Sequence, residues 1–229
     1  MKRKETVDII GELVASMNLD IVATSVVNNM LDNTFYTCNT LHLQKGYVVT
    51  VGLSDYVVSD ITPNVSVTLT GTPSLTALNF TAYTPFYKHG TIITTNVELD
   101  KADDANQITP LVYLREVFVD KFNNTDSSFD RESSLEIFFL AQNSFSETED
   151  DIRSYGLLPM RNLVYRFIET LNNHKDIGKF SDYEIKDWLR FGFETQNGAT
   201  KKIFNFTDLT GCQLNISIPI KKNFSCCTN

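Results

Sequence analysis

The sequence predicts an α+β fold: an N-terminal antiparallel β-sheet, or a small barrel-like sandwich, followed by a mixed sheet with two flanking helices. Two observations favour this class. Residues 34–99 contain short runs rich in Thr, Val, Tyr and Ile, separated by turn residues, as is typical of antiparallel sheets. Residues 159–173 instead carry apolar side chains at the spacing of an amphipathic helix, with strand-like runs on both sides.

Changes in composition along the chain divide it into three regions. We expect an N-terminal helical segment over residues 1–33, a β-rich region over 34–100 and an α+β region over 101–229, or one continuous domain. The polar stretch 100–107 has no periodicity and is the best candidate boundary. A chain of 229 residues with 42% hydrophobic residues can bury a core without disulfides or metals.

In the first half, residues 6–17 predict a short helix, because their apolar side chains recur at helical spacing. Strands are expected over residues 47–52, 56–61, 65–70 and 91–99. Within one of these runs Val65, Val67 and Leu69 alternate with Ser and Thr, so we expect these three side chains to share one face.

In the second half, residues 111–114 fit two structures: a helix that starts at Pro110, or a buried strand that leads into a short helix. We favour the strand. Residues 134–141 predict a central strand because they form a short apolar run. Residues 159–173 predict a helix with Pro159 in its first turn, where a missing N–H leaves no bond unmade.

The C-terminal third predicts a further helix and two strands. Residues 181–184 match a capping box ahead of Ile185, Trp188 and Leu189, which predicts a second short helix. Strands are expected over 201–206 and 212–220. Pro219 indicates that the last strand lies at a sheet edge or ends there.

Net charge and cysteine spacing exclude several classes of protein. The formal charge of −8, from 20 Lys and Arg against 28 Asp and Glu, argues against a protein that wraps nucleic acid. No apolar run approaches the ~18 residues of a membrane span, so no membrane partner is expected. The four cysteines lack the spacing of a disulfide framework, which favours a reducing compartment.

The sequence offers no constellation of residues for catalysis. Cys38 and His42 have tolerable metal-ligand spacing, but no second pair completes a tetrahedral site, so we predict no metal and no cofactor. His89 lies in a turn-like segment, and His174 fits a helix C-terminus. The acidic runs 103–104 and 147–151 are better explained as solvated charge than as an acid–base pair. Motifs for nucleophiles and phosphate loops are missing from the sequence, so we predict no catalytic residue and no enzyme.

Four aromatic residues stand out between the expected strands, in a segment whose sequence is typical of an irregular loop. An outward-facing aromatic loop would anchor a partner, since Tyr and Phe give large contact areas at low entropic cost. Equally, the loop could fold over the open end of the sheet. The candidate interface anchors are Phe80, Tyr83, Phe86 and Tyr87.

Several motifs together resemble small virion proteins of tailed phages that infect Bacteroidetes, crAss-like phages included. They are YTPFYKHGT (83–91), TNVE (95–98), PLVYLRE (110–116), FDRESSLEIFFL (129–140), LLPMRNL (157–163) and KIFNFTDLTG (202–211). The resemblance implies a ring, collar or tail-terminator protein in the neck or tail, made in the host cytoplasm. Its partners would be itself, in a homomeric ring of six or twelve copies, and the neighbouring portal, collar or tail proteins.

The acidic balance fits such a ring, because a negative channel wall repels DNA and lets the genome pass without specific binding. The alternative function is a β-rich binding module, an adhesin or carbohydrate binder, that uses the aromatic segment 80–87. A third hypothesis is a hydrolase built around Cys38 or His89. Self-association without a ligand would favour the ring, and glycan binding by a monomer would favour the module.

Overall fold

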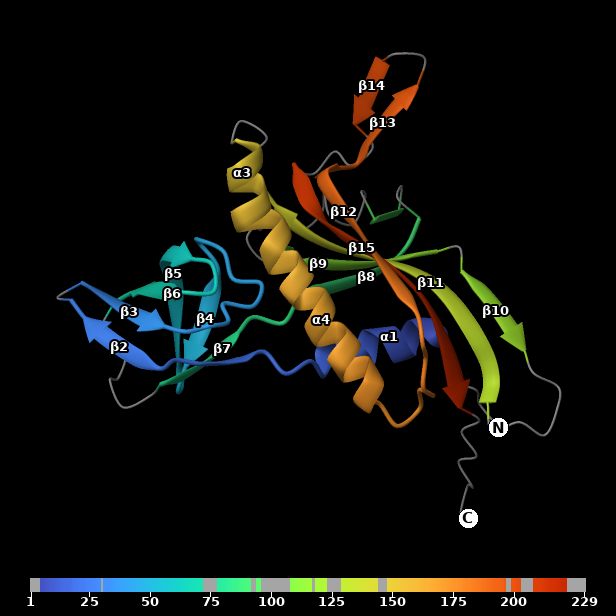
Figure 1. The fold of residues 1–229 in the computed structure, drawn as a ribbon, viewed down its shortest axis with the longest axis horizontal. Helices are drawn as coiled ribbons and strands as arrows, with labels where there is room; N and C mark the ends of the chain where they lie inside the picture. Colours follow the sequence, from blue (N-terminus) through green and yellow to red (C-terminus); the bar gives the residue numbers. More distant parts are fainter. Residues whose placement is uncertain are drawn as a thin grey trace.

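A computed structural model gives the fold of the chain (Figure 1). The residues it describes are 5–29, 31–71, 78–91, 94–95, 108–116, 118–122, 129–143, 148–196, 199–202 and 208–221, with backbone alone for 193–202. The fold is α+β and mostly β, with an N-terminal antiparallel sheet, a second mixed sheet and two main helices. The fold class predicted from the sequence is confirmed.

The first sheet is an antiparallel half-barrel of seven strands in the order β1-β7-β4-β5-β6-β3-β2. Its strands are β1 (Asp20–Val22), β2 (Ser25–Asn28), β3 (Asp32–Tyr36), β4 (Val48–Val51), β5 (Ser54–Thr62), β6 (Ser66–Thr70) and β7 (Asn79–Ala82). Alternation decides which side chains enter the core: Val67 and Leu69 are fully buried, as expected. Val65 is 52% exposed because it lies in the turn before β6.

The second sheet has the order β12-β15-β11-β9-β8, and β10 pairs with one end of β11. Its strands are β8 (Phe86–Gly90), β9 (Leu111–Arg115), β10 (Val119–Phe122), β11 (Phe129–Gln142), β12 (Tyr183–Phe191) and β15 (Leu209–Lys221). β8 and β9 run parallel, whereas the other pairs are antiparallel, so the sheet is mixed. β13 (Phe193–Gln196) and β14 (Ala199–Lys202) form a separate hairpin that projects from the second sheet (Figure 1).

Two helices pack against the second sheet. α1 (Thr6–Ala15) begins where the sequence predicts, and one continuous helix is formed by α3 (Glu149–Asp151), a π-helical turn (Ile152–Leu157) and α4 (Leu158–Asn173). α4 runs between the two sheets in Figure 1 and buries its apolar stripe in a core that includes residues of both. Two side-chain amides tie the long helix to the connection between β3 and β4: Gln44 donates to the Tyr155 carbonyl (2.6 Å) and Asn162 donates to the Leu41 carbonyl (3.2 Å).

Two elements differ from the sequence-based prediction. The segment after β9 contains the strand β10 in place of a short helix, and residues 183–191 form the strand β12 in place of the second short helix. The spacing of Ile185, Trp188 and Leu189 fits both periods: in the strand, Ile185 and Leu189 pack on the main core while Trp188 packs on the opposite face. Pairing with β15 therefore decides in favour of the strand.

Other predictions hold or fall outside the described residues. Residues 111–114 and 134–141 are strands, the second of them central in its sheet. β15 is an interior strand up to Ile216, where its pairing with β12 ends, so Pro219 has no β12 partner. The expected boundary 100–107, most of the strand 91–99 and residues 203–206 lie outside the described residues, while Thr94 and Thr95 belong to a helical turn.

Candidate interaction surfaces

The four aromatic candidates do not form an irregular loop. Phe80 lies in β7, is 2% exposed and packs edge-on against Phe35, with ring centroids 5.3 Å apart. Phe86 and Tyr87 lie in β8 and are half-buried, and the Tyr87 hydroxyl donates to the Val7 carbonyl at 3.0 Å. Tyr83, 53% exposed, is the one candidate whose side chain can reach a partner without rearrangement. The prediction of an aromatic loop is therefore wrong, because two strands take up most of the segment.

His42 holds the backbone of the same segment in place. Its imidazole is fully buried, and burial lowers the pKa of His42 to about 4, so the ring is neutral at pH 7. In the neutral tautomer that protonates Nε2, this nitrogen donates to the Tyr83 carbonyl at 2.9 Å. Cys38, which has metal-ligand spacing to His42 in the sequence, is exposed to solvent. His42 is thus explained as a structural hydrogen-bond donor.

The other titratable residues considered from the sequence are His89, His174 and the acidic runs, and their environments explain them as structural residues. Burial lowers the pKa of His89, whose ring lies 6.1 Å from that of Phe118. His174 caps the C-terminus of α4, and its Nδ1 accepts the Asp176 N–H at 3.3 Å. Residues 149–151 form the exposed first turn of the long helix, where carboxylates interact favourably with the helix dipole. This agrees with solvated charge at a helix start; residues 103, 104 and 147 lie outside the described residues.

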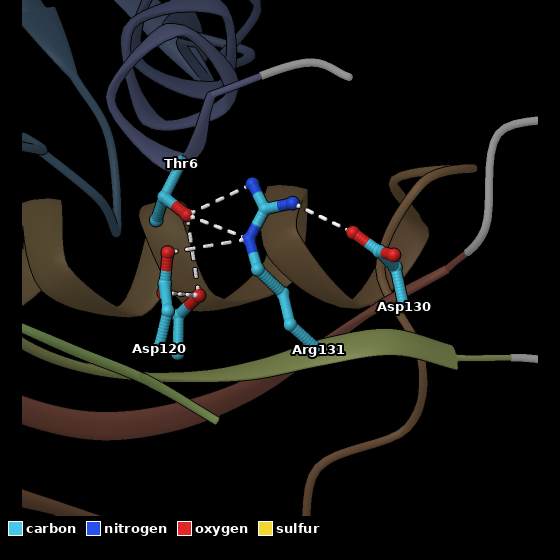
Figure 2. A network of polar contacts seen from close by, with 5 residues as sticks. Thr6, Asp120, Asp130 and Arg131 are labelled. Carbon is cyan, nitrogen blue, oxygen red and sulfur yellow. Dashed lines mark hydrogen bonds and ion pairs between the residues drawn. The ribbon is translucent and has the colours of Figure 1, made fainter. Parts of the chain in front are cut away.

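A buried arginine network joins α1 to the second sheet (Figure 2). The Arg131 guanidinium is 4% exposed; its Nη1 lies 3.0 Å from an Asp130 oxygen and its Nε 3.4 Å from an Asp120 oxygen. Nε and Nη2 also donate to the Thr6 hydroxyl at the start of α1, at 3.2 and 3.1 Å. A buried charge is stable only when paired and hydrogen-bonded, so the network fixes α1 onto β10 and β11.

Sequence reasoning missed this network, although a signal was present. Arg131 shares the strand period of Leu135 and Ile137, which predicts that its side chain faces the core with theirs. An arginine at a core position needs acidic partners, and Asp130 lies directly beside it in the sequence.

A cleft of about 970 Å³ opens on the face of the second sheet opposite α4. Its floor includes Ser134 and Ser217, whose hydroxyls lie 2.8 Å apart on neighbouring strands. Four acidic and four aromatic residues line it, together with Lys179: Glu132, Glu136, Asp182, Glu184, Phe118, Phe129, Phe180 and Tyr183. Of the aromatic residues, Phe118 and Phe180 also pack against the main core. We call this the carboxylate cleft. Glu136 pairs with Arg115 at 2.8 Å, and Glu184 accepts the Asn215 amide at 3.3 Å.

The first sheet has an unusual distribution of charge. Its seven strands contain no Lys or Arg, but they contain four aspartates, Asp20, Asp32, Asp55 and Asp60. The other exposed positions are occupied by Thr, Ser, Asn, Val and Tyr, as in the exposed cross-strand pair Val48 and Val57 and in Tyr36 of β3. This outer face is therefore weakly apolar and negative, with no basic strand residue to neutralise it.

Comparison of the chain with protein families, curated proteins and solved structures found no match. Within the described residues no three His, Cys, Asp or Glu side chains gather as a metal site would require. In the same part of the chain, no helix has both the length and the apolar composition of a membrane span. The two surfaces above are therefore interpreted from their own chemistry.

Proposed function

We propose that the chain is a structural virion protein of a tailed phage, a homomeric ring of six or twelve copies in the neck or tail. The ring connects portal and tail, and genome DNA passes through it without specific binding. The motifs that resemble phage virion proteins motivate this proposal, and the arrangement of charge in the fold supports it.

The observation that carries the proposal is the first sheet, whose strands contain aspartate and no basic residue. A surface that faces moving DNA must not grip phosphates, and Lys or Arg contacts supply most non-specific DNA affinity. Asp20, Asp55 and Asp60 are exposed, so the outer face repels a phosphate backbone. We place this face toward the channel.

A ring also needs two different complementary surfaces on each copy, because head-to-tail contacts are heterologous. β2 and β12 are edge strands of their sheets, and β2 carries neither charge nor proline, the usual protection against edge-to-edge pairing. The β13–β14 hairpin projects from the body, and a two-stranded hairpin is marginally stable alone in water. Contact with a neighbouring copy would stabilise it.

Reversal of the charge on the outer face tests the proposal. The D20K/D55K/D60K variant should still form the ring but should bind labelled duplex DNA in a fluorescence anisotropy titration, with an affinity that falls steeply as salt is raised. The wild-type ring should not bind the duplex at the same salt concentrations. Tight binding of duplex by the wild-type ring would contradict the proposed channel.

The binding-module alternative has less support. It required an aromatic surface over residues 80–87, but Phe80 is a core residue and Tyr83 alone is well exposed. A glycan-array screen of the monomeric protein, repeated with Tyr83→Ala, tests this alternative directly.

A further inference from the structure

We propose that the β13–β14 hairpin of one copy pairs with the free edge of β2 in a neighbouring copy, with β14 as the pairing strand. The inference rests on the proposed ring and names one of the contacts that would hold it together. It assigns the edge of β2 a partner of defined chemistry, a short extended strand that supplies main-chain hydrogen bonds and two lysines.

The edge of β2 offers main-chain groups for such a strand. In an antiparallel pair, every second residue directs its N–H and C=O away from the partner strand. The Asn29 N–H donates to the Asp32 carbonyl at 2.9 Å at the end of the β2–β3 pair, which fixes this alternation. Val26 and Asn28 therefore direct their main-chain groups to the free edge, where none of the described strands pairs with β2. An added strand can bind these groups.

β2 is also the least protected edge strand of the two large sheets. Edge strands usually carry charge or proline, which discourage pairing with another chain. Charged residues occur in β1, β8, β10 and β12, the other edge strands that the structure describes. β2 (Ser-Val-Val-Asn) carries none, and its Val27 is 47% exposed. An added strand would therefore also cover apolar surface.

The hairpin supplies a strand of matching length and charge. In the described part of the chain β13 and β14 pair only with each other, so each has a free edge, and β14 has four residues, as β2 has. Charge decides between the two strands of the hairpin. β3, the neighbour of β2, contains Asp32 and no basic residue. It therefore attracts β14, which ends in Lys201 and Lys202, and repels Glu194 of β13.

The two elements lie at separate ends of one copy. Figure 1 shows β2 at the left end of the molecule and the hairpin at its top, separated in the view by β5, β6 and the beginning of the long helix. A separation across the view remains a separation in space, whatever the depth of the two elements. The contact therefore joins two copies. Because its two sides are different surfaces, it is heterologous, as a ring requires.

Substitutions on both sides of the contact test it. Self-association of the full chain would be measured by sedimentation velocity and native mass spectrometry over a range of concentrations. The edge variants are Val27→Lys, which adds a charge, and Asn28→Pro, which removes an N–H that is directed away from β3. The hairpin variant is K201E/K202E, and a combined variant is V27K/K201E/K202E. Far-UV circular dichroism and thermal unfolding check that every variant is folded.

Two controls match these changes elsewhere on the surface. Val22→Lys places the same charge on β1, the opposite edge of the same sheet, at a residue that is 64% exposed. K175E/K179E reverses the charge of two exposed lysines outside the hairpin. Both controls should assemble as the wild type does, because neither changes the edge of β2 or the hairpin.

The edge variants and the hairpin variant should each weaken self-association at least about tenfold, because each removes a main-chain hydrogen bond or places like charges together. The combined variant should associate at least about threefold more strongly than K201E/K202E, because opposite charges then meet at the edge.

The ring and this contact fail in different ways. Wild-type assembly by the hairpin variant would overturn this inference, because β2 would then pair with something other than β14, such as β2 of a second copy. Wild-type assembly by both edge variants, or an equal loss with Val22→Lys and Val27→Lys, would also overturn it; all three results leave the ring intact. A wild-type protein that never assembles would overturn both.

Discussion

The burial of His42 predicts a specific pH dependence of stability. In the unfolded chain an imidazole has a pKa near its ordinary value of 6.5, whereas in the fold burial lowers the pKa of His42 to about 4. Between these two values the unfolded state binds one more proton than the folded state, so stability falls as the pH falls. Each pKa unit corresponds to about 1.4 kcal/mol, so a pKa lowered by about 2.5 gives a total loss of about 3.5 kcal/mol once the pH is well below 4.

The variant His42→Gln isolates this contribution. Glutamine does not titrate, and its amide N–H can replace the Nε2–H that His42 donates to the Tyr83 carbonyl. Urea unfolding of both proteins at pH 7.5 and pH 4.5 gives four free energies of unfolding. Wild type should lose between about 2 and 3 kcal/mol more than the variant over this interval, since other titrating groups are common to both. A difference that does not change with pH would refute the burial of a neutral imidazole, as would an NMR titration of the ring with a pKa near 6.5.

Three further substitutions test the fold and the surfaces. Arg131→Met should lower the free energy of unfolding by about 3–5 kcal/mol in urea titrations, because it removes the cation that Asp120 and Asp130 face; a loss below about 1 kcal/mol would contradict the network. Gly211→Ala should sharply reduce soluble expression and the melting temperature, because a Cβ there would collide with the carbonyl oxygen of the paired strand; a wild-type melting temperature would show that this pairing is wrong. Phe80→Ala should cost about 3–5 kcal/mol of stability and Tyr83→Ala no more than about 0.5 kcal/mol, so equal costs would refute the placement of these two rings.

The sequence predicted those elements whose periodicity has one interpretation. The stripe of α4 and the alternation of β6 are unambiguous, because their apolar residues fit a single period over several repeats. β12 was missed because Ile185, Trp188 and Leu189 satisfy the helical period by spacing and the strand period by burial on two faces. Pairing with β15, a contact distant in sequence, decides between them, and a local pattern does not contain that contact.

The surfaces were less predictable than the fold. The aromatic segment was interpreted from its composition, but the β7 and β8 pairings that bury Phe80 and half-bury Tyr87 join residues far apart in the chain. The carboxylate cleft likewise assembles Glu132, Asp182 and Glu184 from separate segments. The charge of the first sheet, in contrast, could be counted from the sequence once its strands were assigned, because no basic residue occurs in any of them.

The mass of the recombinant protein in solution tests the proposed ring most directly. Native mass spectrometry, supported by light scattering behind a sizing column, would be carried out over a wide range of concentrations. The proposal predicts one discrete species at six or twelve times the chain mass of 26.0 kDa, with no continuous series of larger species. A mass of 26.0 kDa at every concentration would contradict the proposal.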